Sequence, residues 1–244
     1  MELMEHLQPH VIVPLKIGST NISITTAVLS TWIACILCFI LLTLAGRSGK
    51  LVPKGIQNLM ESMINFMRQS LIVETIGEDG MAWFPFIATL FFFILFCNLL
   101  GLIPRMFTPT SNINVTASLA VVVFICTQGA GIYRHGPLGY LKKFIPKGIP
   151  LWIVPIMVPI EIISQFAKPF SLAVRLFANM TAGHLVILVF LFMIIQFRSV
   201  IIAPFPLLMA VVMMAFEIFV ALIQAYIFSI LASMYIAEAV HEEH

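Results

Sequence analysis

The sequence is poor in charge. Only 10% of its 244 residues are Asp, Glu, Lys or Arg, and 61% are hydrophobic. Soluble domains carry about 25% charged residues, so this composition excludes a soluble globular domain. The net charge is +2, from 13 basic and 11 acidic residues, which is too small to indicate a nucleic-acid partner. These absences predict an integral membrane protein.

Signals of catalysis and of processing are missing as well. There is no Walker motif and no catalytic triad, so we expect no cofactor and no catalysis by this chain on its own. The first ten residues have no cationic region, and no small-residue cleavage site closes a short apolar core. We therefore expect the first apolar run to remain as a membrane helix.

Cysteine is scarce, with four residues that all lie inside apolar runs. Cys35 and Cys38 form a C-x-x-C pair, which in other settings indicates metal or redox chemistry. Their neighbours from Trp32 to Phe39 are lipid-like, and no second pair of ligands follows. We interpret the cysteines as small buried hydrophobic residues and expect no metal site.

Long apolar runs dominate what is present. A helix needs about 20 apolar residues to cross a bilayer. We expect crossing segments at residues 24–45, 84–103, 113–132, 150–197 and 204–240. Residues 1–21 are predicted to form an extracytoplasmic lead-in, and residues 53–73 an amphipathic interfacial helix with apolar positions at helical spacing. Together these segments predict a single all-α membrane domain over residues 1–244.

The last two apolar runs are too long to cross upright. A helix over 150–197 would measure about 70 Å at 1.5 Å per residue, against a hydrocarbon core of about 30 Å. That region must be broken or strongly tilted, with Pro155, Pro159 and Pro169 as candidate break points. The Pro204-Phe-Pro206 turn predicts that the last two helices form a hairpin.

Basic residues near the ends of the apolar runs predict the orientation. They concentrate in two loops, at residues 47–54 and 134–147, and are sparse elsewhere. Cytoplasmic loops carry the excess of Lys and Arg. Five crossings then place the N-terminus outside and the C-terminus in the cytoplasm.

Polar residues interrupt the last two runs. Arg175 keeps its charge in any protein environment, and a cation at the centre of a membrane helix costs about 2.5–3.5 kcal/mol or more. Glu161, Lys168 and Arg175 are spaced by heptads and share a helix face, and Asn179 follows Arg175 by one turn. A functional role on an ion path is the first interpretation; snorkelling to a headgroup and a structural ion pair are the alternatives.

The hairpin predicts which polar residues face each other. His184 and Glu217 lie at similar distances from the turn, as do Arg175 and Gln224 further from it. His184 and Glu217 can exchange protons, whereas Arg175 cannot. This indicates a graded polar route, although a buried ion pair that fixes helix register would have the same spacing.

The motifs resemble those of subunit a of the F-type ATP synthase family. The first is Lys168-Pro-x-Ser-Leu-x-x-Arg175-Leu-Phe-x-Asn179-Met-x-Ala-Gly-His184. The others are Glu217-x6-Gln224-Ala-x-Ile-Phe and Phe96-x-Asn98-Leu-x-Gly-Leu-Ile-Pro104. The resemblance spans most of the chain from about residue 50 onward.

The resemblance implies a proton-translocating stator subunit without catalysis of its own. Arg175 would face the carboxylates of a rotor ring of c-type subunits and separate two aqueous half-channels. His184, Glu217, Asn179 and Gln224 match positions that line the half-channels or support the arginine, and Ser171, Lys168 and Glu161 are further candidates for support. Relative to some members, the acid and the base at positions 184 and 217 are exchanged.

The implied partners are the other components of the complex. They are the c-type ring, the b-type subunits of the peripheral stalk, and the lipid of a bacterial-type plasma (inner) membrane; ATP chemistry would occur on other subunits. We expect a proton as the coupling ion, although the residues here do not distinguish it from sodium.

Three alternatives compete with this interpretation. A stand-alone ion channel or secondary transporter would need a complete ion path and usually internal repeats, and no repeat is visible. An intramembrane enzyme would need a nucleophile with a base, or a metal-ligand set. A pure assembly scaffold would leave Arg175 unexplained.

Overall fold

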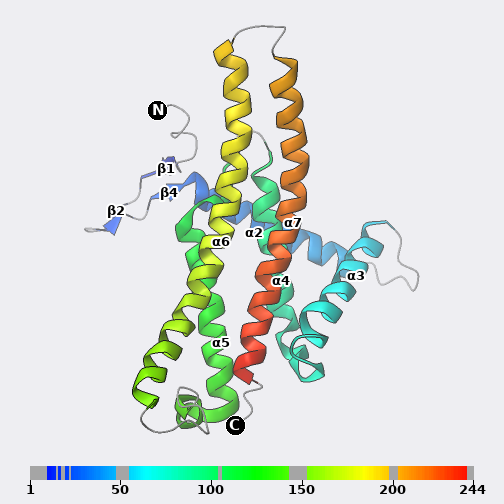
Figure 1. Cartoon of the computed structure of the whole chain (residues 1–244). Helices are drawn as coiled ribbons and strands as arrows, with labels where there is room; N and C mark the ends of the chain where they lie inside the picture. The colour runs from blue at the N-terminus through cyan, green and yellow to red at the C-terminus, as the bar shows by residue number, and fades with distance from the viewer. Residues whose placement is uncertain are drawn as a thin grey trace.

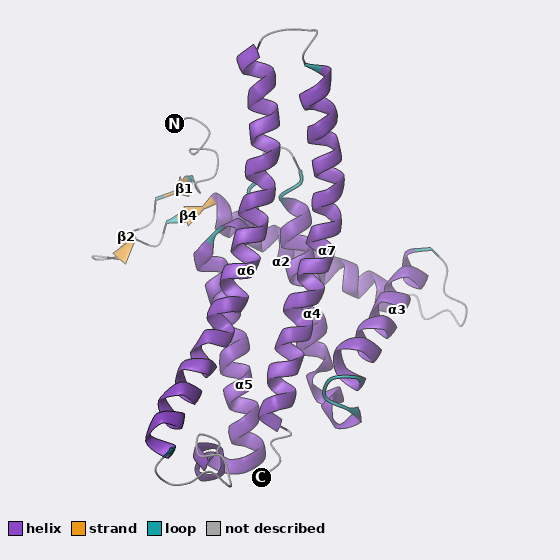
Figure 2. Cartoon of the chain, in the orientation of Figure 1, coloured by secondary structure: helices purple, strands orange, loops and turns teal. Residues whose placement is uncertain are grey.

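Helices make up most of the computed structural model, which describes residues 10–14, 16–17, 20–21, 23–47, 55–103, 106–142, 153–197 and 203–240 (Figure 2). Two short antiparallel strand pairs precede the first helix. β1 (Val11–Val13) pairs with β4 (Ile24–Thr25), and β2 (Lys16–Ile17) pairs with β3 (Thr20–Asn21). The prediction of an all-α membrane protein is confirmed, although Ile24, expected to open the first crossing helix, lies in a strand.

Five helices in the described residues are long and apolar enough to cross a membrane. They are α2 (Thr26–Arg47), α4 (Phe84–Leu100), α5 (Ile113–Lys142), α6 (Val154–Phe197) and α7 (Pro204–Val240). The 3-10 turn η2 (Glu78–Trp83) leads into α4. A helix pairs its internal backbone donors and acceptors within the segment, which the bilayer core requires; Pro137 in α5 and Pro159 and Pro169 in α6 are local exceptions.

Helices α6 and α7 form the predicted hairpin and run side by side for much of their length (Figure 1). The 44 residues of α6 span about 66 Å at 1.5 Å per residue, roughly twice the hydrocarbon core. The expected break points do not break it, because Pro159 and Pro169 lie inside a continuous helix. Proline bends a helix without ending it when neighbouring helices support the freed carbonyls. Near its N-terminal end, α6 leans away from α7 (Figure 1).

Helix α5 extends beyond the expected end at residue 132. It continues to Lys142 across a kink at Gly136, where φ is 73° and Pro137 follows. After the kink the helix folds back on itself, so that the ring of Tyr140 packs against Gly131. The Tyr140 hydroxyl donates a hydrogen bond of 2.7 Å to Oε1 of Gln128. The start of the expected basic loop, including Arg134, is therefore helical.

The predicted amphipathic segment contains α3 (Ile56–Met67), which is followed by the π-helical turn η1 (Arg68–Val73). Met60 and Met67 are buried, whereas Leu59 and Phe66 on the other face are exposed. A π-helical turn shifts the hydrogen-bond register and leaves carbonyls for other donors. The hydroxyl of Ser233 in α7 donates to the backbone oxygen of Leu71, which ties η1 to the last helix.

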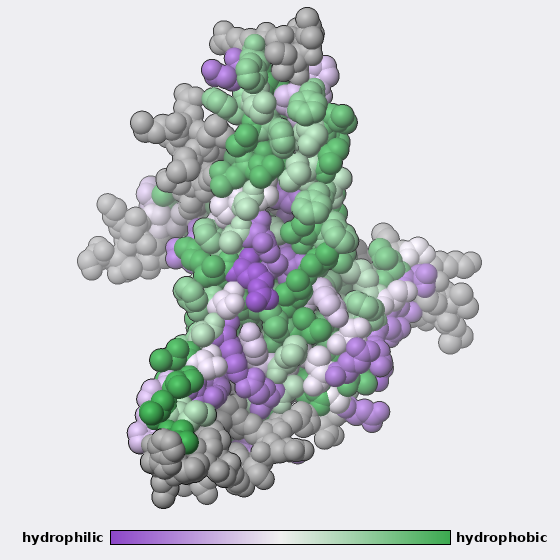
Figure 3. Space-filling view, viewed as in Figure 1, coloured by the Kyte–Doolittle hydropathy of each residue, from purple (hydrophilic) through white to green (hydrophobic). Residues whose placement is uncertain are grey.

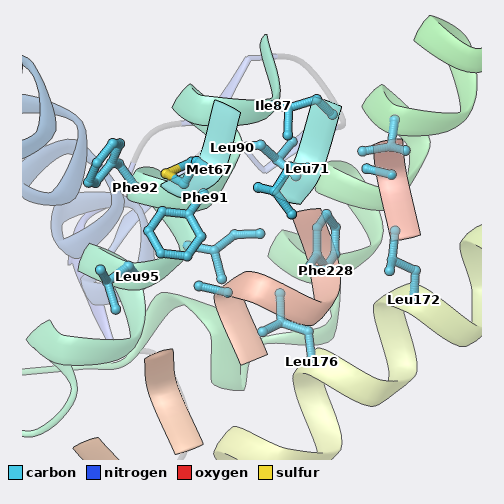
Figure 4. Packing of buried hydrophobic residues seen from close by; sticks show 14 of the residues in the cluster. Met67, Leu71, Ile87, Leu90, Phe91, Phe92, Leu95, Leu172, Leu176 and Phe228 are labelled. Atoms are coloured by element: carbon cyan, nitrogen blue, oxygen red, sulfur yellow. The ribbon is translucent and has the colours of Figure 1, made fainter. Parts of the chain in front are cut away.

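The core lies where α3 and η1 meet α4, α6 and α7 (Figure 4). Its largest fully buried side chains include Phe92 of α4, Leu71 of η1, Phe228 of α7, and Leu172 and Leu176 of α6. Between membrane helices, close van der Waals packing replaces the hydrophobic driving force of water-soluble proteins. This packing fixes the rotation of α6, so its polar residues are held on defined faces.

Candidate functional site

His184 of α6 and Glu217 of α7 meet across the hairpin. Nδ1 of His184 lies 3.2 Å from Oε1 of Glu217, and both side chains are largely buried, with 14% and 5% exposed. Each residue lies equally far along the chain from the middle of the segment that connects the two helices. The structure therefore brings together the pair that the hairpin spacing predicted.

A glycine lets the two helices approach at this point. A Cβ atom on Gly183 would lie 2.8 Å from Oε1 of Glu217 and 3.1 Å from its Cδ. Real Cβ contacts are longer than 3.0 Å, so any side chain at residue 183 would displace the carboxylate. The absence of a side chain allows Glu217 to lie flat against α6 beside His184.

A third residue contacts the imidazole from a different segment. The hydroxyl of Thr108, next to the 3-10 turn η3 (Pro109–Ser111), forms a hydrogen bond with Nε2 of His184. Sequence reasoning missed Thr108. The only signal was the polar but nearly uncharged stretch at 108–112, which follows a crossing segment. Both ring nitrogens of His184 thus have a polar neighbour.

A cavity of about 550 Å³ opens beside this cluster. It is lined by the segment before β1, α2, the α4–α5 connection, α6 and α7; most lining side chains are apolar, and the polar ones are His10, Thr26, Ser30, Thr108, Ser111, His184 and Glu217. A polar cavity holds water once it exceeds about 10–15 Å³, and this one is far larger. Among the described residues, Oε2 of Glu217 has no hydrogen-bond partner, and buried carboxylate oxygens require one. The cavity provides room for water to supply it.

Asn179 and Gln224 form a second contact between α6 and α7. Nδ2 of Asn179 donates a hydrogen bond of 2.8 Å to Oε1 of Gln224. Gln224 is buried, whereas Asn179 lies at the edge of the exposed face of α6. The sequence predicted that Gln224 lies at a depth similar to that of Arg175. In the structure Gln224 is hydrogen-bonded to Asn179, which lies one turn beyond Arg175 on α6.

Arg175 points outward from the hairpin. It is exposed, and so are its apolar neighbours along α6, Phe170 and Val174, as well as Phe219 on α7. Within the described parts of the chain, no hydrogen bond or ion pair involves its guanidinium. On the face where α6 and α7 run together, Figure 3 shows hydrophilic side chains surrounded by hydrophobic ones.

The remaining candidates on α6 lie away from the His184–Glu217 pair. Nζ of Lys168 is 2.5 Å from Oε1 of Glu238 and 5.7 Å from the ring centre of Tyr235. Glu161 accepts a hydrogen bond of 3.1 Å from Nε2 of Gln165 in its own helix, and Ser171 is exposed. Glu238 lies inside α7, which continues to Val240, and its side chain stays 46% exposed beside Lys168; residues 241–244 lie outside the described part.

The described residues contain no group of three or more His, Cys, Asp or Glu side chains that could hold a metal ion. Cys38 and Cys97 are buried, as expected for small hydrophobic residues, and Cys126 is partly buried. Cys35 is exposed in the chain, which corrects its expected burial. It lies on a face of α2 that also exposes Trp32, Ile36 and Phe39, a composition suited to lipid.

Comparison with known proteins gives consistent matches. The sequence matches the family described as ATP synthase A chain over residues 28–237. ATP synthase subunit a of Chloroherpeton thalassium is 44% identical over 237 residues, covering 94% of this chain and 71% of that protein. The subunit of Magnetococcus marinus is 42% identical, covering 99% of this chain and 93% of that protein. That of Parvibaculum lavamentivorans is 41% identical, covering 96% and 91%.

Proposed function

The chain belongs to the ATP synthase A chain family, and from that premise we propose that it provides two aqueous half-channels separated by Arg175. It is a multi-pass membrane subunit of the proton-translocating sector of the synthase. In the proposed mechanism, protons pass through this chain to and from carboxylates on a rotor ring of c-type subunits. ATP chemistry occurs on other subunits.

The observation that carries the proposal is the outward, unpaired position of Arg175. A permanent cation on an apolar membrane face costs about 2.5–3.5 kcal/mol or more unless a partner compensates it. None of the described residues supplies a carboxylate; the exposed neighbours of Arg175 on α6 include the apolar Phe170 and Val174 and the uncharged polar Ser171 and Asn179. A carboxylate on a neighbouring membrane protein would satisfy the charge, and a guanidinium suits carboxylates because of its planar set of donors.

The cavity beside His184 and Glu217 supports the outer half-channel. It reaches the pair from the side of α2 and the α4–α5 connection. Imidazole and carboxylate groups can each take up and release protons, and water in the cavity connects them with the outside. A proton received by Glu217 or His184 then passes to a carboxylate of the ring. Asn179 and Gln224 hold α6 and α7 together between this pair and Arg175.

The charge state of the ring carboxyl then determines where this group can move. A protonated ring carboxyl can turn into lipid, whereas the ionised form would cost several kcal/mol. On reaching the inner half-channel it releases its proton, and the resulting carboxylate is attracted to Arg175. The fixed positive charge also repels protons and so prevents a direct leak between half-channels. Each proton that crosses 100 mV contributes about 2.3 kcal/mol.

The proposal also covers the membrane in which the chain lies, its orientation there, and its stalk partners. The concentration of basic residues in two loops supports an N-terminus outside and a C-terminus in the cytoplasm of a bacterial-type inner membrane. Peripheral-stalk subunits of the b type would hold this chain still while the ring turns. Glu161, Lys168 and Ser171 lie on the stretch of α6 before Arg175 and are the candidates for the inner half-channel.

The test is ATP-driven acidification of inverted membrane vesicles with Arg175→Ala. We expect acidification to fall by about 100-fold, because losing about 3 kcal/mol of charge stabilisation corresponds to two orders of magnitude. Arg68→Ala is the matched control, since Arg68 is an exposed arginine on η1 and not on α6 or α7, and should leave the rate unchanged. Unchanged acidification by Arg175→Ala, with the ATPase head still bound, would contradict the proposal and favour a channel or scaffold.

A further inference from the structure

We propose that Thr108 is a positioning residue that holds the His184 imidazole in one orientation in both of its protonation states. The inference rests on the proposed function, because it assigns a role within the proposed outer half-channel. It comes from the contact between the Thr108 hydroxyl and Nε2 of His184, together with the Glu217 carboxylate 3.2 Å from Nδ1.

The chemistry of a hydroxyl suits this position. A hydroxyl can donate one hydrogen bond and accept others. When Nε2 carries a proton, Thr108 accepts from it; when Nε2 is bare, Thr108 donates to it. The hydrogen bond at one ring nitrogen determines which tautomer is present and how the ring is oriented. Thr108 can therefore keep Nδ1 directed at Glu217 while His184 gains and loses a proton.

Thr108 is itself held in place by α4 and α7. Its carbonyl oxygen accepts a hydrogen bond of 2.8 Å from the hydroxyl of Ser111. Thr110, two residues further on, donates to Oδ1 of Asn98 at 2.7 Å, and Nδ2 of Asn98 donates to the backbone oxygen of Ala221 at 3.3 Å. Ala221 lies one turn beyond Glu217 on α7. The same buried network therefore places both neighbours of the imidazole.

Gly101 provides the space that Thr108 needs. A Cβ atom at residue 101 would lie 1.8 Å from Oγ1 of Thr108 and 2.7 Å from its Cβ. No side chain is compatible with that approach, so even alanine would push the hydroxyl away from His184. Substitution of Gly101 should thus reproduce the loss of the Thr108 hydroxyl without altering residue 108.

The experiment measures ATP-driven acidification of inverted vesicles containing the complete synthase, per assembled complex, across a series of pH values. Thr108→Val removes the hydroxyl and keeps the shape of the side chain. We expect the rate to fall by about twofold to tenfold, the range that corresponds to one net hydrogen bond, and its pH dependence to shift. Thr108→Ser keeps a hydroxyl and should restore the native pH profile. Gly101→Ala should behave like Thr108→Val.

The matched control is Thr116→Val. Thr116 is a buried threonine whose hydroxyl bonds the Ile113 carbonyl in its own helix, so its removal should leave the pH profile unchanged. A native rate and pH profile in Thr108→Val would overturn the assignment of Thr108. If Thr108→Val assembles poorly, a native profile in Gly101→Ala would overturn it equally. The proposed function fails separately, if Arg175→Ala still acidifies the vesicles.

Discussion

Helix α6 carries two polar residues, His184 and Arg175, that differ in whether this chain supplies their hydrogen-bond or ion-pair partners. His184 points inward, where Glu217 and Thr108 approach its two ring nitrogens from other segments of the chain. Arg175 lies on the same helix and points outward, without an ion-pair partner among the described residues. The inward cluster of His184, Glu217 and Thr108 is completed within this chain, whereas for the outward cation we propose a carboxylate from another protein.

This difference distinguishes His184, whose contacts lie within the fold, from Arg175, whose charge we propose is compensated by a partner. Burying a polar group without hydrogen bonds is costly, so the inward cluster must be paired whenever the chain is folded. An exposed arginine imposes no such condition on the isolated chain. Its cost arises in the membrane, and in the proposed function a carboxylate of the partner compensates it. Changes in the inward cluster should therefore affect packing and transport together, and changes at Arg175 transport alone.

The largest effect inside the chain is expected from His184 and Glu217. His184→Ala or Glu217→Gln should lower ATP-driven proton pumping by about 100-fold, the range typical of a lost proton-transfer group. The double variant His184→Glu with Glu217→His keeps one acid and one base in contact and should recover part of the rate. Pumping by inverted vesicles, normalised to assembled complex, measures the effect.

The control for this exchange is Glu61→Gln, which removes an exposed carboxylate on α3 and should leave pumping unchanged. Absence of any recovery in the exchanged double variant would contradict a shared half-channel. It would return the pair to a structural role in helix register.

A smaller effect on pumping is expected from substitution of Gly183, which lies against the Glu217 carboxylate. Gly183→Ala places a methyl group 2.8 Å from Oε1 of Glu217, and overpacking of this kind costs about 1–3 kcal/mol. Pumping should fall by about tenfold, because the carboxylate must move away from His184. The matched control is Gly129→Ala in α5, where nothing lies within 4 Å of the new Cβ. Equal pumping rates in the two variants would show that the distance between Glu217 and α6 is unimportant.

Helical spacing predicted the inward pair but could not predict its third member. The hairpin predicts that His184 and Glu217 can face each other, because residues equally far from one turn lie at the same level along the two helices. Thr108 comes from a connection between two other helices, and its position depends on the Asn98 network and on the space at Gly101. Those contacts join segments far apart in the sequence. A polar loop in a membrane protein indicates exposure to water, and it does not indicate which helix the loop will reach.

Proline left two conformations of α6 open in the sequence. Pro159 and Pro169 are candidate break points because each removes one backbone hydrogen bond, and a strong tilt without a break is the alternative. The helix continues through both prolines, and membrane helices tolerate such a lost hydrogen bond. The outward position of Arg175, in contrast, depends on rotation of α6 by its core residues Leu172 and Leu176, which heptad spacing alone does not set.

The smallest effect is expected at Lys168, one heptad before Arg175 on the same helix. This cation has a carboxylate within the chain, 2.5 Å away on Glu238, but the two side chains are 23% and 46% exposed. Exposed ion pairs contribute about 0–1 kcal/mol and weaken as salt is added. Lys168→Ala should therefore lower the thermal stability of the complex in detergent only slightly, and salt should reduce the difference. Pumping should fall by no more than about twofold.

Exchange of the two charges, Lys168→Glu with Glu238→Lys, gives the sharper measurement. If the pair acts only as an ion pair, the exchanged variant should regain the native stability that each single charge reversal loses, and its pumping should match that of Lys168→Ala or exceed it. A loss of pumping in Lys168→Ala as severe as that in Arg175→Ala would contradict the distinction between the two cations. It would mean that Lys168 takes part in ion movement although it is paired with Glu238. Lys168 would then act on the ring carboxylates as Arg175 is proposed to do.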